Sequence, residues 1–403
     1  MTTWPRSGWQ SVVGFGLVSL AGDMVYEGAR SIYGPLLGLL GASALVVGLV
    51  TGAGEGMALL LRLFSGSLAD RTGRYWALTI TGYALTAVCV PLLAVTPLIG
   101  AGGLALAIVL ILAERTGKAI RSPAKSALLA TAAGAVGLGR GFAVHKALDQ
   151  VGGFAGPLMV AGVLAATGLM WPALAILAVP GALAVGLLLR IRSSSPADAA
   201  PRATVAAGPL SRQFYMFAGA AGAATAGLAT FGLISYHASR LGVIPLAAVP
   251  VLYAAAMAAA AVAALASGWL FDRWNAKVLY ALPALGAAVP ALAFAGSTTA
   301  IVAGAVLWGA AGGVQDSTVK ALVADLVPAA RRATAYGVFA AVQGAAALGG
   351  GLLAGALYER SRTALIVVLA LLQLLALALL AATLAMRSRE MSNREMSDRP
   401  ASL

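Results

Sequence analysis

Acidic and basic side chains occur inside stretches of the sequence that are otherwise apolar. Asp23, Glu27 and Arg30 lie in one such stretch, and their spacing of four and three residues puts them on one face of a helix. An ionised group inside a bilayer costs about 2.5–3.5 kcal/mol on insertion scales, so it usually faces a cavity or a partner. Carboxylates screened from water can bind and release protons near neutral pH. We therefore expect Asp23 and Glu27 to be the first candidates for proton coupling.

Further ionisable groups occur in other apolar stretches. Asp149 and His145 lie four residues apart and are the next candidates for proton coupling, followed by Glu55 and Glu114. Each of these groups could instead belong to a permanent structural ion pair. Arg115 follows Glu114 directly, so these two side chains are expected to point in different directions around a helix and to serve separate partners.

Other kinds of chemistry lack the residues that they need. The chain has one cysteine, Cys89, and two histidines, so neither disulfides nor a Cys- or His-based metal site is expected. No Gly-Lys-Ser/Thr phosphate loop occurs, which argues against ATP-driven transport. No serine lies in a nucleophile-elbow context. We expect no cofactor, no bound metal and no enzymatic activity.

Long apolar segments must position these groups. Of the 403 residues, 60% are hydrophobic and 10% are charged, and the mean hydropathy is +0.90, which is more apolar than a globular surface can hide from water. Apolar runs of about 18 residues or more can cross a hydrocarbon core of about 30 Å. The runs are continuous rather than alternating, which predicts an all-α membrane protein and not a β-barrel.

Twelve transmembrane helices are predicted, at residues 11–40, 44–63, 76–96, 100–120, 140–166, 171–190, 213–237, 247–270, 278–296, 299–319, 335–357 and 364–386. The first is too long for an upright span, and Gly34-Pro35 predicts a kink or an early end within it. The start of the chain, MTTWPRSGWQ, has no cleavage site after a short apolar core, so the first run is read as a span and not as a removed signal.

The positive charges predict the orientation in the membrane. With both termini in the cytoplasm, 21 lysines and arginines fall on the cytoplasmic side, against three on the outer side: Arg240, Arg360 and Arg362. This split satisfies the positive-inside rule and predicts a multi-pass protein of the cell membrane. It also accounts for the net charge of +13 without nucleic acid as a partner.

The two halves of the chain repeat. Gly66, Asp70 and Arg71 recur 202 residues later as Gly268, Asp272 and Arg273. The predicted organisation is a six-helix bundle at 1–190, a cytoplasmic linker at 191–212, a second six-helix bundle at 213–386 and a solvated, partly disordered cytoplasmic tail at 387–403. Two parallel six-span repeats predict a pseudo-symmetric transporter architecture with a site near the midplane, between the bundles. A monomer is expected.

The buried acids do not repeat. At the corresponding offsets the second half has Thr225 for Asp23, Met257 for Glu55, Phe339 for His145 and Gln343 for Asp149. Residues that only hold a six-span bundle together should occur in both halves, so the one-sided set favours a function. Asp316 is the exception. It stands opposite Arg121 by the repeat, and the two could pair across the halves and close a cytoplasmic gate.

The motif Gly66-x-x-x-Asp70-Arg71-x-Gly73-Arg74 resembles the loop signature of the major facilitator superfamily, with Tyr75 where that family usually has another base. Gly152-Gly-Phe-Ala-Gly156-Pro157 resembles the Gly-x-x-x-Gly-Pro motif of its antiporter branch, and ERTGKAIRSPAKSALLA is similar to the basic span-four stretch of bacterial drug-type exporters. The resemblance covers essentially the whole chain. It implies the twelve-helix fold and transport by alternating access.

The expected transporter architecture suggests two further sets of functional residues: a conformational latch and a substrate cavity. The charged loops and the Arg121–Asp316 pair would latch one conformation, through Gly66, Asp70, Arg71, Gly73, Arg74, Arg121, Asp272, Arg273 and Asp316. Glycines 66 and 73 would permit a close helix approach and a tight turn. The second-half spans offer mostly small residues with a few aromatics and amides, which suits an apolar or weakly polar organic solute. The predicted substrate cavity comprises Arg30, Arg115, Phe231, Tyr236, Tyr253, Trp308, Gln315 and Gln343.

Three functions remain open at this point. The favoured one is a proton-driven exporter of a small organic compound. The second is an uptake symporter or facilitator, because the cluster of Asp23, Glu27 and Arg30 could also bind a zwitterion or a chelated metal. The third is a membrane protein that transports nothing, such as a sensor or a lipid-modifying enzyme; no catalytic constellation favours it.

Overall fold

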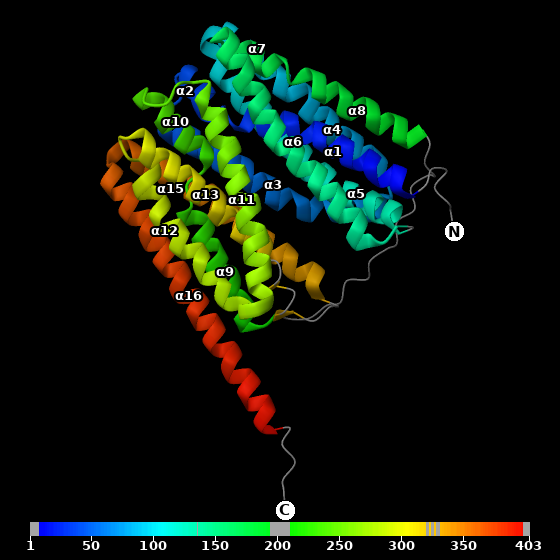
Figure 1. Ribbon diagram of the computed structural model, residues 1–403, viewed down its shortest axis with the longest axis vertical. Helices are drawn as coiled ribbons and strands as arrows, with labels where there is room; N and C mark the ends of the chain where they lie inside the picture. The colour runs from blue at the N-terminus through cyan, green and yellow to red at the C-terminus, as the bar shows by residue number, and fades with distance from the viewer. Residues whose placement is uncertain are drawn as a thin grey trace, which may run out of the picture.

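The computed structural model describes residues 8–134, 136–193, 210–319, 322–323, 326–327 and 331–397, and it describes the backbone alone at 272, 318, 332–333 and 389–397. The described residues form helices joined by short turns (Figure 1). The first half contains α1 Gly8–Arg30, α2 Tyr33–Leu39, α3 Ala44–Thr72, α4 Tyr75–Leu92, α5 Gly103–Ala133, α6 Leu138–Thr167, α7 Met170–Ala175 and α8 Ala178–Ser193, with 3₁₀ turns η1 Leu93–Leu98 and η2 Gly100–Gly102. The second half contains α9 Arg212–Gly227, α10 Phe231–Leu241, α11 Ala248–Trp274, η3 Asn275–Tyr280, α12 Ala281–Ala293, α13 Thr298–Val314, the π-helical turn η4 Gln315–Val319, α15 Arg332–Arg360 and α16 Arg362–Ser397.

Each predicted span corresponds to one helix or to two consecutive ones. Within the described residues, eleven segments are long and apolar enough to cross a bilayer. The remaining predicted span, 100–120, is α5, whose central turns carry Glu114, Arg115 and Lys118. Glu114 and Arg115 are buried, so these charges face the protein interior and not lipid. The chain is therefore an all-α multi-pass membrane protein.

The first span breaks earlier than predicted. The expected position was Gly34-Pro35, but α1 ends at Arg30 and α2 begins at Tyr33, so the break falls at Ser31 and Ile32. Pro35 lies in the first turn of α2, where its missing N–H removes no intrahelical bond. The proline therefore stiffens the start of the second helix and does not end the first.

Two helices of the first half extend past their predicted ends. α3 continues to Thr72 and α5 to Ala133, although the apolar runs stop near residues 63 and 120. Hydropathy marks where charges begin, but a helix continues where those charges face a cavity or water. The tail follows the same pattern, because α16 continues to Ser397, so residues 387–397 are helical and not disordered. Residues 194–209 of the predicted linker and 398–403 of the tail lie outside the described residues.

The charged signature is therefore largely helical and not a loop. Asp70 and Arg71 lie on the last turns of α3, and Gly73 ends the helix with a φ of +66°, which favours glycine. Tyr75 begins α4 and donates a hydrogen bond of 2.9 Å to Asp70. Gly66 does not require glycine, since a Cβ there would meet its nearest neighbour, Pro123, at an ordinary 3.7 Å.

The second-half copy keeps the geometry in part. Asn275 follows the end of α11 with a φ of +51°, at the repeat position of Gly73. Asparagine tolerates positive φ better than most residues. Arg273 is exposed on the last turn of α11, and the side chain of Asp272 lies outside the described residues.

The two halves share one core at one end only. Ile32 and Leu36 at α2 pack in a single buried cluster with Phe231 and Ile234 of α10, whereas toward the linker each half has a core of its own. Figure 1 shows α2 beside α10 at this shared end, and the start of α1 and the end of α16 lie away from it. We call the α2/α10 end the closed end, and the end at which Ser193 and Arg212 lie the linker end.

Glycines bring α1 and α6 into backbone contact. A Cβ on Gly152 would lie 2.1 Å from the carbonyl oxygen of Leu20, and one on Gly156 would lie 2.2 Å from that of Met24. Pro157 follows within a helix that continues to Thr167. The Gly/Pro motif therefore lets α6 pack directly behind the turns of α1 that carry Asp23 and Glu27.

Replacing Gly156 by alanine should disrupt this contact. The added methyl group meets the backbone of Met24, which cannot rotate away, and overpacking of this kind costs about 1–3 kcal/mol. Gly162→Ala on the same helix is the matched control, because nothing lies within 4 Å of its Cβ position. Thermal unfolding of the purified protein should show a lower melting temperature for Gly156→Ala alone. Equal melting temperatures for the two variants would contradict the packing role.

Candidate functional site

A cavity of about 920 Å³ lies between the two halves. Its first-half wall comes from α1, α3, α5 and α6, and its second-half wall comes from α9 and the turn after it, α11, α13, η4 and α15. The side chain of Lys146, on the wall toward the linker end, is 65% exposed, so the cavity is open there. The charged residues that line it are Asp23, Glu27, Arg30, Glu55, Arg62, Lys118, Arg121, Lys125, Lys146, Asp149 and Asp316.

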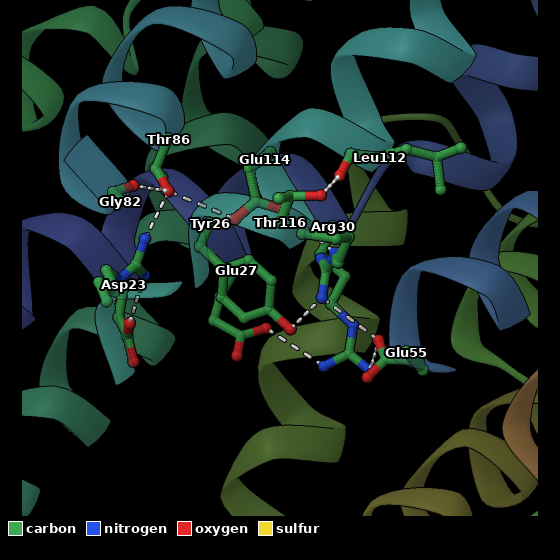
Figure 2. Close-up of polar contacts among 12 residues, drawn as sticks. Asp23, Tyr26, Glu27, Arg30, Glu55, Gly82, Thr86, Leu112, Glu114 and Thr116 are labelled. Carbon is green, nitrogen blue, oxygen red and sulfur yellow. Dashed lines mark hydrogen bonds and ion pairs between the residues drawn. The ribbon is translucent and has the colours of Figure 1, made fainter. Parts of the chain in front are cut away.

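A charged network forms the inner part of this wall. Arg30 is central, with its Nη2 2.8 Å from Glu55 and its Nη1 3.5 Å from Glu27 (Figure 2). Tyr253 of α11 donates a hydrogen bond to Glu27 and accepts one of 3.0 Å from Arg30. The second half therefore contacts the acidic face of α1 through this hydroxyl group. A break in any of these contacts would change the surroundings of Glu27.

Arg115 lies behind the network and is 2% exposed. Its guanidinium donates to the Tyr26 hydroxyl and lies 3.4 Å from Glu55. Its Nε is 3.1 Å from Glu114, which is fully buried and accepts a hydrogen bond of 3.5 Å from Thr86. The expectation that Glu114 and Arg115 point apart is therefore only half right. They have different further partners, but the flexible arginine bends back onto its neighbour, because a buried carboxylate needs a counter-charge.

Asp23 stands one turn nearer the linker end. Arg121 lies 3.9 Å from it and donates a hydrogen bond to Thr86 (Figure 2). Arg121 also packs over the ring of Tyr83. Both Arg121 and Asp316 line the cavity, and in this structure the carboxylate paired with Arg121 is Asp23. The pairing of Arg121 with Asp316 across the halves stays a prediction.

Asp149 belongs to a second polar group, at the linker side of the wall. It accepts hydrogen bonds of 2.7 Å from Ser19 and 2.6 Å from Lys146, and Lys125 donates to Ser19 at 2.8 Å. His145, four residues before it, does not line the cavity. It is buried at 7% exposure, and its Nε2 has no hydrogen-bond partner among the described residues.

The second-half wall is apolar with a few amides. Gln315 and Gln343 line it and donate to the Thr225 hydroxyl at 3.1 and 3.4 Å. Trp308 also lines it, held by a hydrogen bond of 2.8 Å to Ala229. Like Arg115 of the first half, three predicted cavity residues of the second half lie elsewhere: Phe231 and Tyr253 pack behind Trp308, and Tyr236 borders a separate groove at the closed end.

Sequence reasoning missed three bases of the cavity. Arg62, Lys118 and Lys125 were counted on the cytoplasmic side as charges that set the orientation, but they lie on α3 and α5 and line the wall. Helical periodicity could have found the two lysines, because they share one face of a helix with Glu114 and Arg121 at spacings of four and three residues. Within the described part of the chain, no group of three or more His, Cys, Asp or Glu residues is placed to hold a metal ion.

Comparison with known proteins identifies the class. The profile of the Major Facilitator Superfamily matches residues 17–282 and 216–402. The uncharacterized protein Rv2265 of Mycobacterium tuberculosis (strain ATCC 25618 / H37Rv) and the uncharacterized protein Mb2288 of Mycobacterium bovis are each 52% identical over 383 residues, covering 92% of this chain and 91% of theirs.

Solved structures share the fold at low identity. A mutant of the nucleoside transporter NupG has a TM-score of 0.73 at 14% identity, with 93% of this chain and 99% of that chain covered. A POT family transporter in complex with 5-aminolevulinic acid has a TM-score of 0.74 at 11% identity, with 94% and 96% covered. A bacterial homologue of the human lysosomal transporter Spinster, in an inward-facing and occupied conformation, has 0.65 at 16%, with 94% and 96% covered.

The fold and the cavity between its halves are those of a multi-pass membrane transport protein. The chain belongs to the major facilitator superfamily.

Proposed function

We propose that this protein exports a small organic compound in exchange for protons, by alternating access. The observation that carries the proposal is the cavity wall, in which Asp23, Glu27, Glu55 and Asp149 all come from the first half. Groups that bind protons inside the membrane span are typical of proton relays. The aromatic and amide residues of the opposite wall leave a surface for an organic solute.

The conformation supports an orientation. The halves share a core at the closed end and are separate at the linker end, where the cavity is open. The excess of lysine and arginine toward the linker end supports a cytoplasmic location for that end and for both termini, in a protein of the cell membrane. In this orientation the cavity is open to the cytoplasm, which is the state in which an exporter loads its cargo. The proposed working unit is a monomer, since one chain supplies both walls.

The alternating step follows from the packing. The seam between the halves runs along α3 and α15, where a Cβ on Gly48 would lie 2.3 Å from the carbonyl oxygen of Gly351. Backbone contact of this kind lets two bundles rock without large side chains to repack. Protonation of Glu27 or Asp23 removes a charge that holds Arg30 or Arg121, so the network loosens as protons bind. Coupling then follows if cargo and proton occupy the wall in alternation.

The alternative function is uptake of a zwitterionic nutrient or a metal chelate. It is favoured by one observation: carboxylates and guanidinium groups alternate along the first-half wall, so both charges of a zwitterion would find a partner. This alternative predicts accumulation by cells, whereas export predicts the reverse.

Growth and accumulation assays separate the two directions. A strain that expresses the protein should tolerate at least one compound of a toxic panel better than a strain with an empty vector, and should accumulate less of it. A proton uncoupler should abolish the difference. Greater accumulation in the expressing strain would favour uptake, and a difference that survives the uncoupler would contradict proton coupling.

A further inference from the structure

The cavity wall carries more positive charge than its carboxylates neutralise. Four of its acids are paired with bases within the 4.0 Å ion-pair distance, in the contacts Glu27–Arg30, Glu55–Arg30, Asp23–Arg121 and Asp149–Lys146. The fifth acid, Asp316, has a contact of its own. Three bases, Arg62, Lys118 and Lys125, have no carboxylate at ion-pair distance within the described part of the chain. A cation in a membrane span is stabilised by water in a cavity or by an anionic partner, so these bases can bind an anion that enters the cavity.

Two of these bases lie on neighbouring turns. The Ser65 hydroxyl bonds to the carbonyl oxygen of Ala119 at 2.8 Å and to that of Arg62 at 3.4 Å. This hydroxyl therefore ties the Arg62 turn of α3 to the Lys118 turn of α5. Both side chains line the cavity from adjacent helices.

Neither Arg62 nor Lys118 has a hydrogen-bond acceptor for its side chain in the part of the chain that the structure describes. The Nε of Arg62 is buried without a hydrogen-bond partner among the described residues. The ammonium group of Lys118 lies 3.2 Å from the centroid of the Tyr26 ring, a cation–π contact, and its three donors have no oxygen acceptor within the described ranges. Lys125 differs, because it donates to Ser19. Arg62 and Lys118 thus form a pair of cations with free donors, which we call the basic pair.

The opposite wall fits the remainder of an organic anion. Met257, Ala258, Ala261 and Trp308 provide apolar surface, and the one charged second-half residue among those that line the cavity is Asp316, which has a contact of its own. A solute with an anionic end and a flat apolar body would satisfy both walls at once. A cationic solute would instead have to compete with the bases that are already paired with the four acids.

We propose that the basic pair is the anchor for the acidic group of the cargo, so that the transported compound is an organic anion, an aromatic or similarly flat carboxylate. This inference rests on the proposed function for the cavity being the transport site, and it replaces the weakly polar solute expected from the sequence. Arg62 offers a planar donor group and Lys118 offers a point charge, a combination that suits a carboxylate.

Binding to the purified, full-length protein in lipid nanodiscs, with no pH gradient, tests the inference. The probes are matched acids and amides: benzoate and benzamide, 2-naphthoate and 2-naphthamide, indole-3-acetate and indole-3-acetamide. At least one carboxylate should bind about tenfold more tightly than its amide, since a hydrogen bond to a charged group outweighs a neutral one by roughly that factor. Arg62→Gln and Lys118→Gln should each remove most of that preference, and Lys118→Arg should retain it.

Matched controls separate the basic pair from the general positive charge. Arg140→Gln and Lys277→Gln remove exposed bases that do not line the cavity, and they should leave carboxylate binding unchanged. Equal binding of every acid and its amide would overturn the proposal, as would an equal loss in the control variants. If a carboxylate binds as expected but no proton-driven movement of it occurs, the site stands and the proposed function fails. If neutral compounds are exported in exchange for protons while no acid binds, the proposed function stands and the assignment of the cargo as an organic anion fails.

Discussion

The double variant Asp23→Asn, Glu27→Gln is expected to lose proton-driven transport completely. In proteoliposomes with an imposed pH gradient, uphill movement of a transported compound should fall to the level of liposomes without protein. The reason is that both carboxylates of α1 on the cavity wall become groups that cannot take up a proton. Exchange of labelled for unlabelled compound without a gradient should continue, because exchange needs the cavity but no net proton movement.

The variant should remain folded. Arg30 keeps Glu55 at 2.8 Å after Glu27 is neutralised, and Arg121 keeps the Thr86 hydroxyl after Asp23 is neutralised. Asparagine and glutamine also preserve the side-chain volumes. The matched control is Glu359→Gln, which removes a carboxylate near the closed end that does not line the cavity. Uphill transport that survives in the double variant would assign coupling to other groups, with Asp149 the next candidate.

The second large effect concerns stability. Arg115→Met is expected to lower the free energy of unfolding by about 3–5 kcal/mol, because it leaves a buried carboxylate without its counter-charge. Glu114 is fully buried and would lose the guanidinium 3.1 Å away, while the Tyr26 hydroxyl would lose its donor. Thermal unfolding of the purified protein in detergent is the direct readout. Arg140→Met, at an exposed position near the linker end, serves as the control and should be neutral.

A compensating variant makes this prediction sharper. Arg115→Met, Glu114→Gln removes both charges, and replacing a buried ion pair with neutral groups of similar volume is often close to neutral. The double variant should therefore be more stable than Arg115→Met alone. If the two unfold at the same temperature, Glu114 is not the group whose charge Arg115 compensates.

Much of the fold could be predicted from the sequence. Segments that cross a bilayer must be apolar, and lysine and arginine are in excess on the cytoplasmic side, so both patterns are visible in the residue types alone. The segment over residues 11–40 shows where this reasoning fails. Proline predicted the break, but Pro35 is compatible with a first helical turn, and the chain bends earlier, at Ser31 and Ile32. The position of such a bend depends on the residues that pack around it, and conformational preferences of single residues carry no information about that packing.

Sequence reasoning singled out the acids of the site but only part of its bases. Asp23, Glu27 and Glu55 are visible because carboxylates in apolar runs are exceptional. Arg62 and Lys118 were missed, because they lie at the cytoplasmic ends of the predicted spans, where a base is read as a charge that fixes the orientation. The helices continue because these side chains face the cavity between the halves. The contact of Tyr253 with Glu27 joins residues 226 positions apart, so only the three-dimensional packing reveals it.

The central claim is that two bundles rock about a shared cavity and that acids of one bundle tie this motion to protons. Electron–electron distances between spin labels test it most directly, in a Cys89→Ser background. One pair of labels belongs at the linker end, on Arg140→Cys and Lys277→Cys, and the other at the closed end, on Leu39→Cys and Arg362→Cys. The account predicts two distances for each pair, with the linker-end distance shortening as the closed-end distance lengthens. It also predicts that the populations shift between alkaline and acidic pH, and that Asp23→Asn, Glu27→Gln removes the shift. A single, pH-independent distance at both ends would contradict it.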